Sequence, residues 1–149
     1  MNDYRVAKLE TPASLYLTNS TVVRGTLFLA EFSATHSGHE TVLDLMRSSS
    51  PMLPMHDQAG RFFLVGRHHI VGTEVSATSA GAKNLVSSVP ARIETTGGHI
   101  FQGQLRIPAG MGDRISDALN GDFAWHALQT GSVITWLSRQ HIIKAHTDA

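Results

Sequence analysis

Hydrophobic and polar residues alternate along two short stretches near the start of the chain. In residues 14–18 leucines occupy every second position, and in residues 23–29 a valine, a glycine and two leucines do so. A period of two is typical of β-strands that bury one face. Asn19 lies between the two stretches and tolerates the positive φ angle of a tight turn, so the pattern predicts a β-hairpin.

The same hairpin pattern returns 78 residues later, in residues 92–96 and 101–107. Gly103 then takes the place of Gly25, in the middle of the buried face of the second strand. A glycine at such a position indicates a sharp bend or a close approach of two backbones. Gly97-Gly98 supplies the turn in the second hairpin.

Later segments repeat as well, with offsets of 73 and 72 residues. Residues 42–46 match residues 115–119, and residues 67–71 match residues 139–143. The offset changes only where one copy has a longer loop. Because duplicated units tolerate changes of length in loops and not in paired strands, we interpret the chain as one unit written twice.

A short helix is predicted after the second strand of each copy, because apolar residues there follow an i, i+3, i+4 spacing. The helical positions are Val42, Leu45 and Met46 in the first copy and Ile115, Ala118 and Leu119 in the second. Further strands are predicted at residues 52–55, 62–66 and 70–75, and at residues 123–128, 133–138 and 141–145. The expected unit is therefore β-β-α-β-β-β.

The domain organisation follows from the repeat. We expect an N-terminal segment at residues 1–12, a first β-barrel repeat at 13–75, a linker at 76–90 and a second β-barrel repeat at 91–147. Small and polar residues dominate the first half of the linker. A unit of about 60 residues buries too little apolar surface to be stable alone, so the two copies are expected to pack together or against a partner chain.

The first copy resembles the Sm-like barrel of bacterial Hfq, on residues 14–19, residues 23–27 and the Arg67-His68-His69-Ile70 segment. The second copy keeps Arg139 and Ile142 but has Gln140 at the histidine position. The resemblance implies mainly β structure, as two tandem Sm/SH3-like small β-barrels that associate edge to edge. Here the short helix is inserted after the second strand, whereas an Sm-like protein carries its helix before the first.

A second resemblance lies in residues 113–120. Their Arg-Ile-Ser-Asp-Ala-Leu-Asn run is similar to the Arg-Ile/Leu-Ser-Asp-x-Leu-Asn signature of an uncharacterised bacterial family with a small β-barrel.

Composition narrows the classes of function. Twelve Lys and Arg residues balance twelve Asp and Glu residues, which argues against a dominant phosphate-binding surface. The chain has no cysteine, which excludes disulfides, thiolate metal sites and a thiol nucleophile and favours the cytoplasm. We find no signal-peptide pattern and no apolar run long enough for a bilayer, so we expect a cytoplasmic protein without membrane insertion.

Three sets of residues are candidates for a site. His36, His39 and Glu40 carry ligand types that suit Zn²⁺, although loop histidines are more often simply solvated. The Sm-like resemblance implies an RNA-binding surface at Arg67, His68 and Arg139. Trp125 and Trp136 occur only in the second copy, and each is either a core residue or an anchor for a partner.

No cofactor motif and no catalytic set emerges from the sequence. The first hypothesis is a non-enzymatic assembly or adaptor protein that joins copies of itself, or a larger complex, through the exposed strand edges of its barrels. The alternatives are an Sm-like RNA-binding protein and a histidine-based metal- or ligand-binding module.

Overall fold

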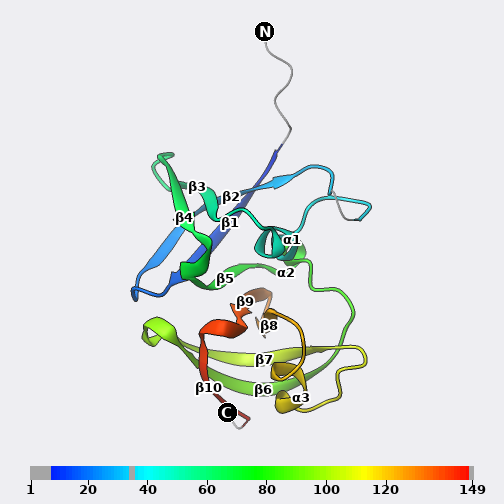
Figure 1. The fold of residues 1–149 in the computed structure, drawn as a ribbon. Helices are drawn as coiled ribbons and strands as arrows, with labels where there is room; N and C mark the ends of the chain where they lie inside the picture. The colour runs from blue at the N-terminus through cyan, green and yellow to red at the C-terminus, as the bar shows by residue number, and fades with distance from the viewer. Residues whose placement is uncertain (1–7, 34–35, 148–149) are drawn as a thin grey trace.

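The structure is a computed structural model that describes residues 8–33 and 36–147. The described chain is mainly β, with ten strands in one antiparallel sheet (Figure 1). The strand order is β10-β6-β7-β8-β9-β5-β1-β2-β3-β4. The sheet is not closed, because β4 and β10 each have a neighbour on one side only.

The elements of the first half follow the predicted order. They are β1 (Lys8–Leu17), β2 (Val22–Ala30), α1 (Val42–Arg47), β3 (Met52–Asp57), β4 (Phe62–Gly66), the 3₁₀ turn η1 (Arg67–His69) and β5 (Ile70–Ser76). A single helical turn, α2 (Ala77–Ala80), leads into the second half.

The elements of the second half repeat this order. They are β6 (Leu85–Thr95), η2 (Thr96–Gly98), β7 (Ile100–Pro108), α3 (Ile115–Leu119), β8 (Trp125–Thr130), β9 (Val133–Ser138), η3 (Arg139–His141) and β10 (Ile142–His146). β1 to β5 together with α1 form unit 1, and β6 to β10 together with α3 form unit 2.

Two boundaries differ from the sequence-based expectation. β1 begins within the predicted N-terminal segment 1–12, and β6 begins at Leu85, within the predicted linker 76–90. Residues 85–90 contain two adjacent serines and a proline, a composition that does not show the alternation typical of a strand. They are nevertheless extended, because backbone pairing with β7 does not require apolar side chains, and Ser88 lies opposite Arg106.

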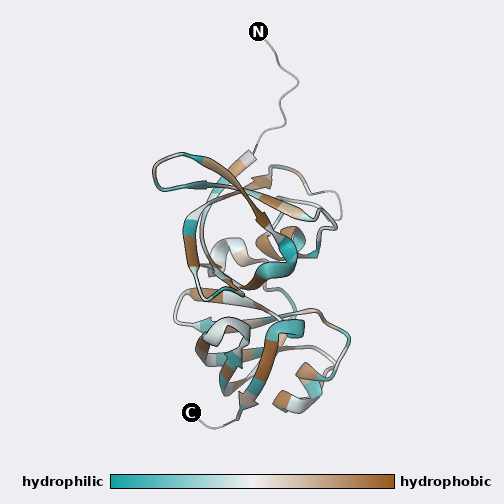
Figure 2. Ribbon diagram, turned by 60° about the vertical axis from the view of Figure 1, so that its left-hand side comes forward, coloured by the Kyte–Doolittle hydropathy of each residue, from teal (hydrophilic) through white to brown (hydrophobic). Residues whose placement is uncertain are grey.

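The two units have the same pattern of strand pairing. In unit 1, β1 pairs with β2 and β5, and β3 pairs with β2 and β4. In unit 2, β6 pairs with β7 and β10, and β8 pairs with β7 and β9. Hydrophobic and hydrophilic residues alternate along strands of both units (Figure 2).

Gly25 and Gly103 occupy equivalent places in the two units. Gly25 lies opposite Ala13, and Gly103 lies opposite Ala91. A Cβ atom on Gly25 would come within 2.1 Å of the His56 carbonyl oxygen, and one on Gly103 within 2.6 Å of the Gln129 carbonyl oxygen. The close backbone approach predicted for these two glycines is confirmed.

The buried hydrophobic side chains form two clusters. Leu15, Leu27 and Leu53 belong to the cluster inside unit 1, and Ile93 and Leu105 belong to the cluster inside unit 2. Each cluster also receives side chains from the other unit, and this exchange takes place where β5 pairs with β9.

Candidate assembly edges

The two units join through antiparallel pairing of β5 with β9. The register runs from Gly72 opposite Leu137 to Ser76 opposite Val133. Val71 of unit 1 packs in the cluster of unit 2, whereas Trp136 of unit 2 packs in the cluster of unit 1. The junction therefore combines backbone hydrogen bonds with a mutual exchange of core side chains.

Side-chain hydrogen bonds add to the junction. His99 Nε2 lies 2.8 Å from the carbonyl oxygen of Leu17, and His141 Nε2 lies 2.8 Å from that of His68. Since a carbonyl only accepts, each ring nitrogen carries the proton and donates. Trp136 Nε1 donates to the carbonyl oxygen of Ala80 at 2.8 Å.

The edges joined at this junction have equivalents elsewhere in the chain. Because the units share their pairing pattern, β10 of unit 2 corresponds to β5 of unit 1, and β4 of unit 1 corresponds to β9 of unit 2. β10 and β4 are the two free edges of the sheet. Among the described strands, one edge of each kind is thus paired internally and one of each kind is unpaired.

The exposure of equivalent side chains differs sharply between the paired and unpaired edges. Val71 is fully buried, but its equivalent Ile143 on β10 is 70% exposed. Trp136 on β9 is 3% exposed, but its equivalent Leu64 on β4 is 51% exposed. Phe62 of β4 is also 62% exposed. The free edges therefore display apolar side chains at the positions that the internal junction buries.

A hollow of about 410 Å³ lies beside the free β4 edge, and Leu17, Val23, Phe63 and Val65 are among the residues that line it. In unit 2, the equivalents of Val23 and Val65 are Phe101 and Leu137. The corresponding place in unit 2 is filled by side chains of unit 1. Tyr16 packs edge-on against Phe101 with ring centres 4.8 Å apart, and Val71 packs in the same cluster. The open hollow in unit 1 is the counterpart of a filled site in unit 2.

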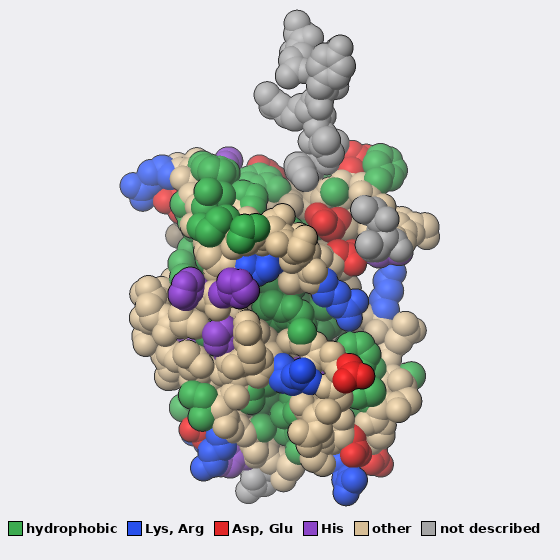
Figure 3. All heavy atoms as spheres, in the orientation of Figure 1, with side chains coloured by type: hydrophobic (Ala, Val, Ile, Leu, Met, Phe, Trp, Pro, Cys, Tyr) green, Lys and Arg blue, Asp and Glu red, His purple; other side chains and the backbone are tan. Residues whose placement is uncertain are grey.

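Exposed hydrophobic side chains gather over the β3–β4 hairpin (Figure 3). Met52 of β3 adds to Phe62 and Leu64, with 45% of its surface exposed. An apolar strand edge that bears such side chains is a surface on which a further strand can pair.

The tryptophans singled out from the sequence lie at the internal junction. Trp136 is buried, and Trp125 is half-buried and packs against the cluster of unit 1. Both therefore contact the neighbouring unit of the same chain.

The residues implied in RNA binding have structural contacts. Arg67 Nη1 donates to the carbonyl oxygen of Leu45 at 2.7 Å, and burial lowers the pKa of this guanidinium. Arg139 Nη1 donates to the carbonyl oxygen of Gly121. Arg67 therefore links η1 to α1 within unit 1. In the same way, Arg139 links η3 to the segment after α3 within unit 2. The His68 side chain is exposed.

The residues suggested for metal binding also have other partners. His36 Nε2 lies 2.6 Å from Asp44 Oδ2, His39 Nδ1 lies 2.7 Å from the carbonyl oxygen of Glu31, and Glu40 Oε1 accepts from the amide of Ala30. Within residues 8–33 and 36–147, no group of three or more His, Cys, Asp or Glu side chains is arranged to hold a metal ion.

The contacts of His36 stabilise the start of α1. A hydrogen bond to the carbonyl of Ser37 and another to Asp44 raise the pKa of His36. Burial acts to raise the pKa of Asp44, but hydrogen bonds from the Thr41 amide and from His36 outweigh it and lower that pKa. Thr41 and Asp44 form a reciprocal capping box at the N-terminus of α1.

The particular residues of the free edges were missed by the sequence analysis, which proposed exposed strand edges without locating them. A signal was present, because residues 62–65 form a continuous apolar run instead of alternating. Such a run predicts a strand that is covered on both faces. Within one chain β4 is not covered in this way, because Phe62 and Leu64 are exposed.

The chain matches no protein-family model, and comparison with curated proteins and with solved structures finds no match. Among the described helices, none has the length and apolar character required to cross a bilayer.

Proposed function

We propose that this protein is a non-enzymatic assembly protein that joins copies of itself head to tail, with β4 of one chain pairing with β10 of the next. We also propose that each unit is an Sm-like barrel, with its helix inserted after the second strand. The observation that carries the proposal is the internal β5–β9 junction, which joins one edge of each kind and leaves the equivalent edges free.

The internal junction supplies the expected geometry of the contact between chains. Transferring its register places Val65 of β4 opposite Lys144 of β10, and Leu64 opposite Ala145. Ile143 of one chain would then enter the hollow beside β4 of the next, as Val71 enters unit 2. Burying a side chain such as isoleucine stabilises a contact by about 1.5–3 kcal/mol.

An interface between two different edges is heterologous, so an open assembly of any length keeps one free β4 edge and one free β10 edge for further growth. This property separates the proposal from a simple two-fold dimer, in which the same edge of both chains would meet. It also provides a direct test, because a chain that lacks one functional edge can still use the other.

The test is the mass of the full chain in solution, measured by sedimentation equilibrium. The wild type is expected to exceed the 16.1 kDa of one chain, in a manner that depends on concentration. Leu64→Lys and Ile143→Lys are each expected to be monomeric, because a buried lysine at either edge opposes pairing. An equimolar mixture of the two variants is expected to form a dimer through its remaining pair of intact edges.

Val86→Lys is the matched control, since Val86 is 68% exposed at the start of β6, before the residues of β6 that pair with β10, and its variant should assemble as the wild type does. The proposal is wrong if each edge variant alone still forms dimers or if the wild type is monomeric. It is also wrong if treatment with RNase reduces the mass of the wild type, which would favour the RNA-binding alternative.

A further inference from the structure

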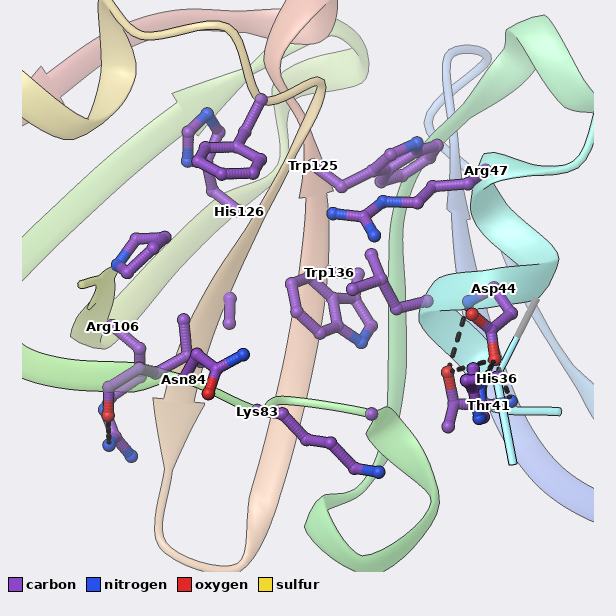
Figure 4. A pocket seen from close by; sticks show the side chains of 16 residues that line it. His36, Thr41, Asp44, Arg47, Lys83, Asn84, Arg106, Trp125, His126 and Trp136 are labelled. Atoms are coloured by element: carbon purple, nitrogen blue, oxygen red, sulfur yellow. Dashed lines mark hydrogen bonds and ion pairs between the residues drawn. The ribbon is translucent and has the colours of Figure 1, made fainter. Parts of the chain in front are cut away.

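A cavity of about 410 Å³ opens between the two units, away from β4 and β10. α1, the segment after α2, the end of β7, the start of β8 and the middle of β9 contribute to its lining (Figure 4). This volume is in the range of small-molecule sites in proteins. The cavity exists within one chain, so an argument about its ligand does not depend on assembly.

Positive charge gathers around the cavity although the whole chain is neutral. Arg47, Lys83 and Arg106 line it, with Asp44 as an acidic neighbour. Asp44 is already held by His36 and by the cap of α1. None of the three cations forms a salt bridge within the part of the chain that the structure describes.

The three cations differ in how they are held. Arg47 and Lys83 are exposed side chains with no hydrogen-bond partner among the described residues, so they are free to turn toward a ligand. Arg106 is fixed, because its Nη2 donates to the carbonyl oxygen of Leu85 at 3.0 Å and its Nη1 donates to Gln129. Its Nε atom is buried and has no partner.

The cavity also contains both tryptophans of the chain. The Nε1 of Trp136 donates to the carbonyl oxygen of Ala80, and with 3% of its surface exposed this indole forms part of the cavity wall. Trp125 is half-buried at the same site. In Figure 4 these rings and the side chains of Arg47 and Lys83 extend into the region between the units. Indole rings bind flat ring systems by stacking, and cations bind anionic groups.

His126 adds a further unsatisfied group to the lining. It is 3% exposed, and burial, followed by the charge of Arg139, lowers its pKa to about 4, so the ring is neutral at pH 7. Its Nε2 atom is buried with no partner. Buried polar nitrogens without partners are uncommon in folded proteins, and here two of them belong to side chains that line one cavity.

We propose that this cavity binds a small molecule with a planar ring and an anionic group. The ring would lie against Trp125, the more exposed of the two indoles. The exposed side chains of Arg47 and Lys83 would turn toward the anionic group, and Arg106 would add fixed positive charge to the cavity wall. Two classes of compound have this chemistry, namely aromatic carboxylates and nucleoside monophosphates.

The experiment is isothermal titration calorimetry of the full chain with 2-naphthoate and with adenosine monophosphate. Their neutral counterparts, 2-naphthamide and adenosine, are titrated in parallel. At least one of the anions is expected to bind saturably, and at least tenfold more tightly than its neutral counterpart. The emission of the two tryptophans should change along the same binding curve. Which anion binds identifies the carboxylate or the phosphate class.

Variants test the role of the charges without disturbing the fold. Arg47→Gln and Lys83→Gln remove exposed cations with no partner, and each is expected to weaken binding of the anion about fivefold to tenfold and to leave the neutral counterpart unchanged. Arg24→Gln, an exposed cation on β2, is the matched control and should have no effect. The proposal is overturned if neither anion binds at millimolar concentration, if the neutral compounds bind equally well, or if the Arg24 variant weakens binding as much.

Discussion

His126 shows how strongly one position can differ between two units of the same fold. It lies opposite Leu137 on β9, as Leu53 lies opposite Val65 on β4, so Leu53 is its equivalent in unit 1. Both side chains are buried, but only the histidine can take up a proton. Unit 2 therefore carries a buried titratable group where unit 1 has a hydrocarbon.

The stability of the chain is expected to fall in mild acid because of His126. Its pKa is near 4 in the folded chain and near 6.5 when unfolded, so protons bind preferentially to the unfolded state. The stabilising contribution of the neutral His126 ring is complete above its pKa in the unfolded chain. It is lost as the pH falls toward the pKa of His126 in the folded chain. Between about pH 7.5 and pH 5 this amounts to roughly 2 kcal/mol of unfolding free energy.

Urea unfolding at a series of pH values measures this effect. His126→Leu, which copies the residue of unit 1, should show a smaller loss of stability over this range by about the same amount. His68→Leu, at an exposed histidine, should keep the loss. Identical pH profiles for the wild type and the His126 variant would rule out the buried imidazole as the cause.

At the level of the strands, Gly25 and Gly103 allow two neighbouring backbones to approach closely. Gly25→Ala would place a methyl group against the His56 carbonyl and force β2 and β3 apart. We expect a loss of about 2 kcal/mol in unfolding free energy, the usual scale for overpacking. Gly103→Ala should act in the same direction on β7 and β8.

Gly66→Ala is the control for this prediction. Gly66 has a φ angle of −65°, and the closest atom to an added Cβ would be Cδ2 of the exposed His69 side chain, which can move. Urea unfolding should give this variant a stability close to that of the wild type. Equal losses for Gly25→Ala and Gly66→Ala would show that backbone contact is not the reason for the glycine.

Over the whole molecule, the exchange of core side chains makes each unit depend on the other. Val71 completes the core of unit 2, and Trp136 completes that of unit 1. We therefore expect a single unfolding transition, with the same midpoint by tryptophan emission and by circular dichroism. Two separated transitions would contradict this expectation.

Val71→Ala should lower the free energy of unfolding by about 2 kcal/mol, with the same value from both probes, because it removes buried methyl groups at the junction. Ile143→Ala changes the equivalent exposed position. At a concentration at which the chain is monomeric, it should leave the free energy of unfolding nearly unchanged. A shift seen by only one probe for Val71→Ala would mean that the units unfold independently.

Most of the secondary structure could be predicted from the sequence, because the period of apolar residues determines which side chains of a strand or helix can be buried. The hairpins, the two short helices and the repeated glycines follow from such local patterns. The ends of strands were predicted less accurately, since β8 begins at Trp125 and not at Phe123. The cavity between the units was not predictable, because it combines side chains from distant parts of the chain.

The sequence by itself determined the repeated unit, since an internal offset and a period of two are visible without any structure. Only the tertiary structure decided which strand edges meet. Backbone hydrogen bonding is the same for every residue, so a pattern of side chains shows which face of a strand is buried but not which neighbour it takes. The pairing of β5 with β9, and the exposure of β4 and β10 that results from it, is a property of the folded chain.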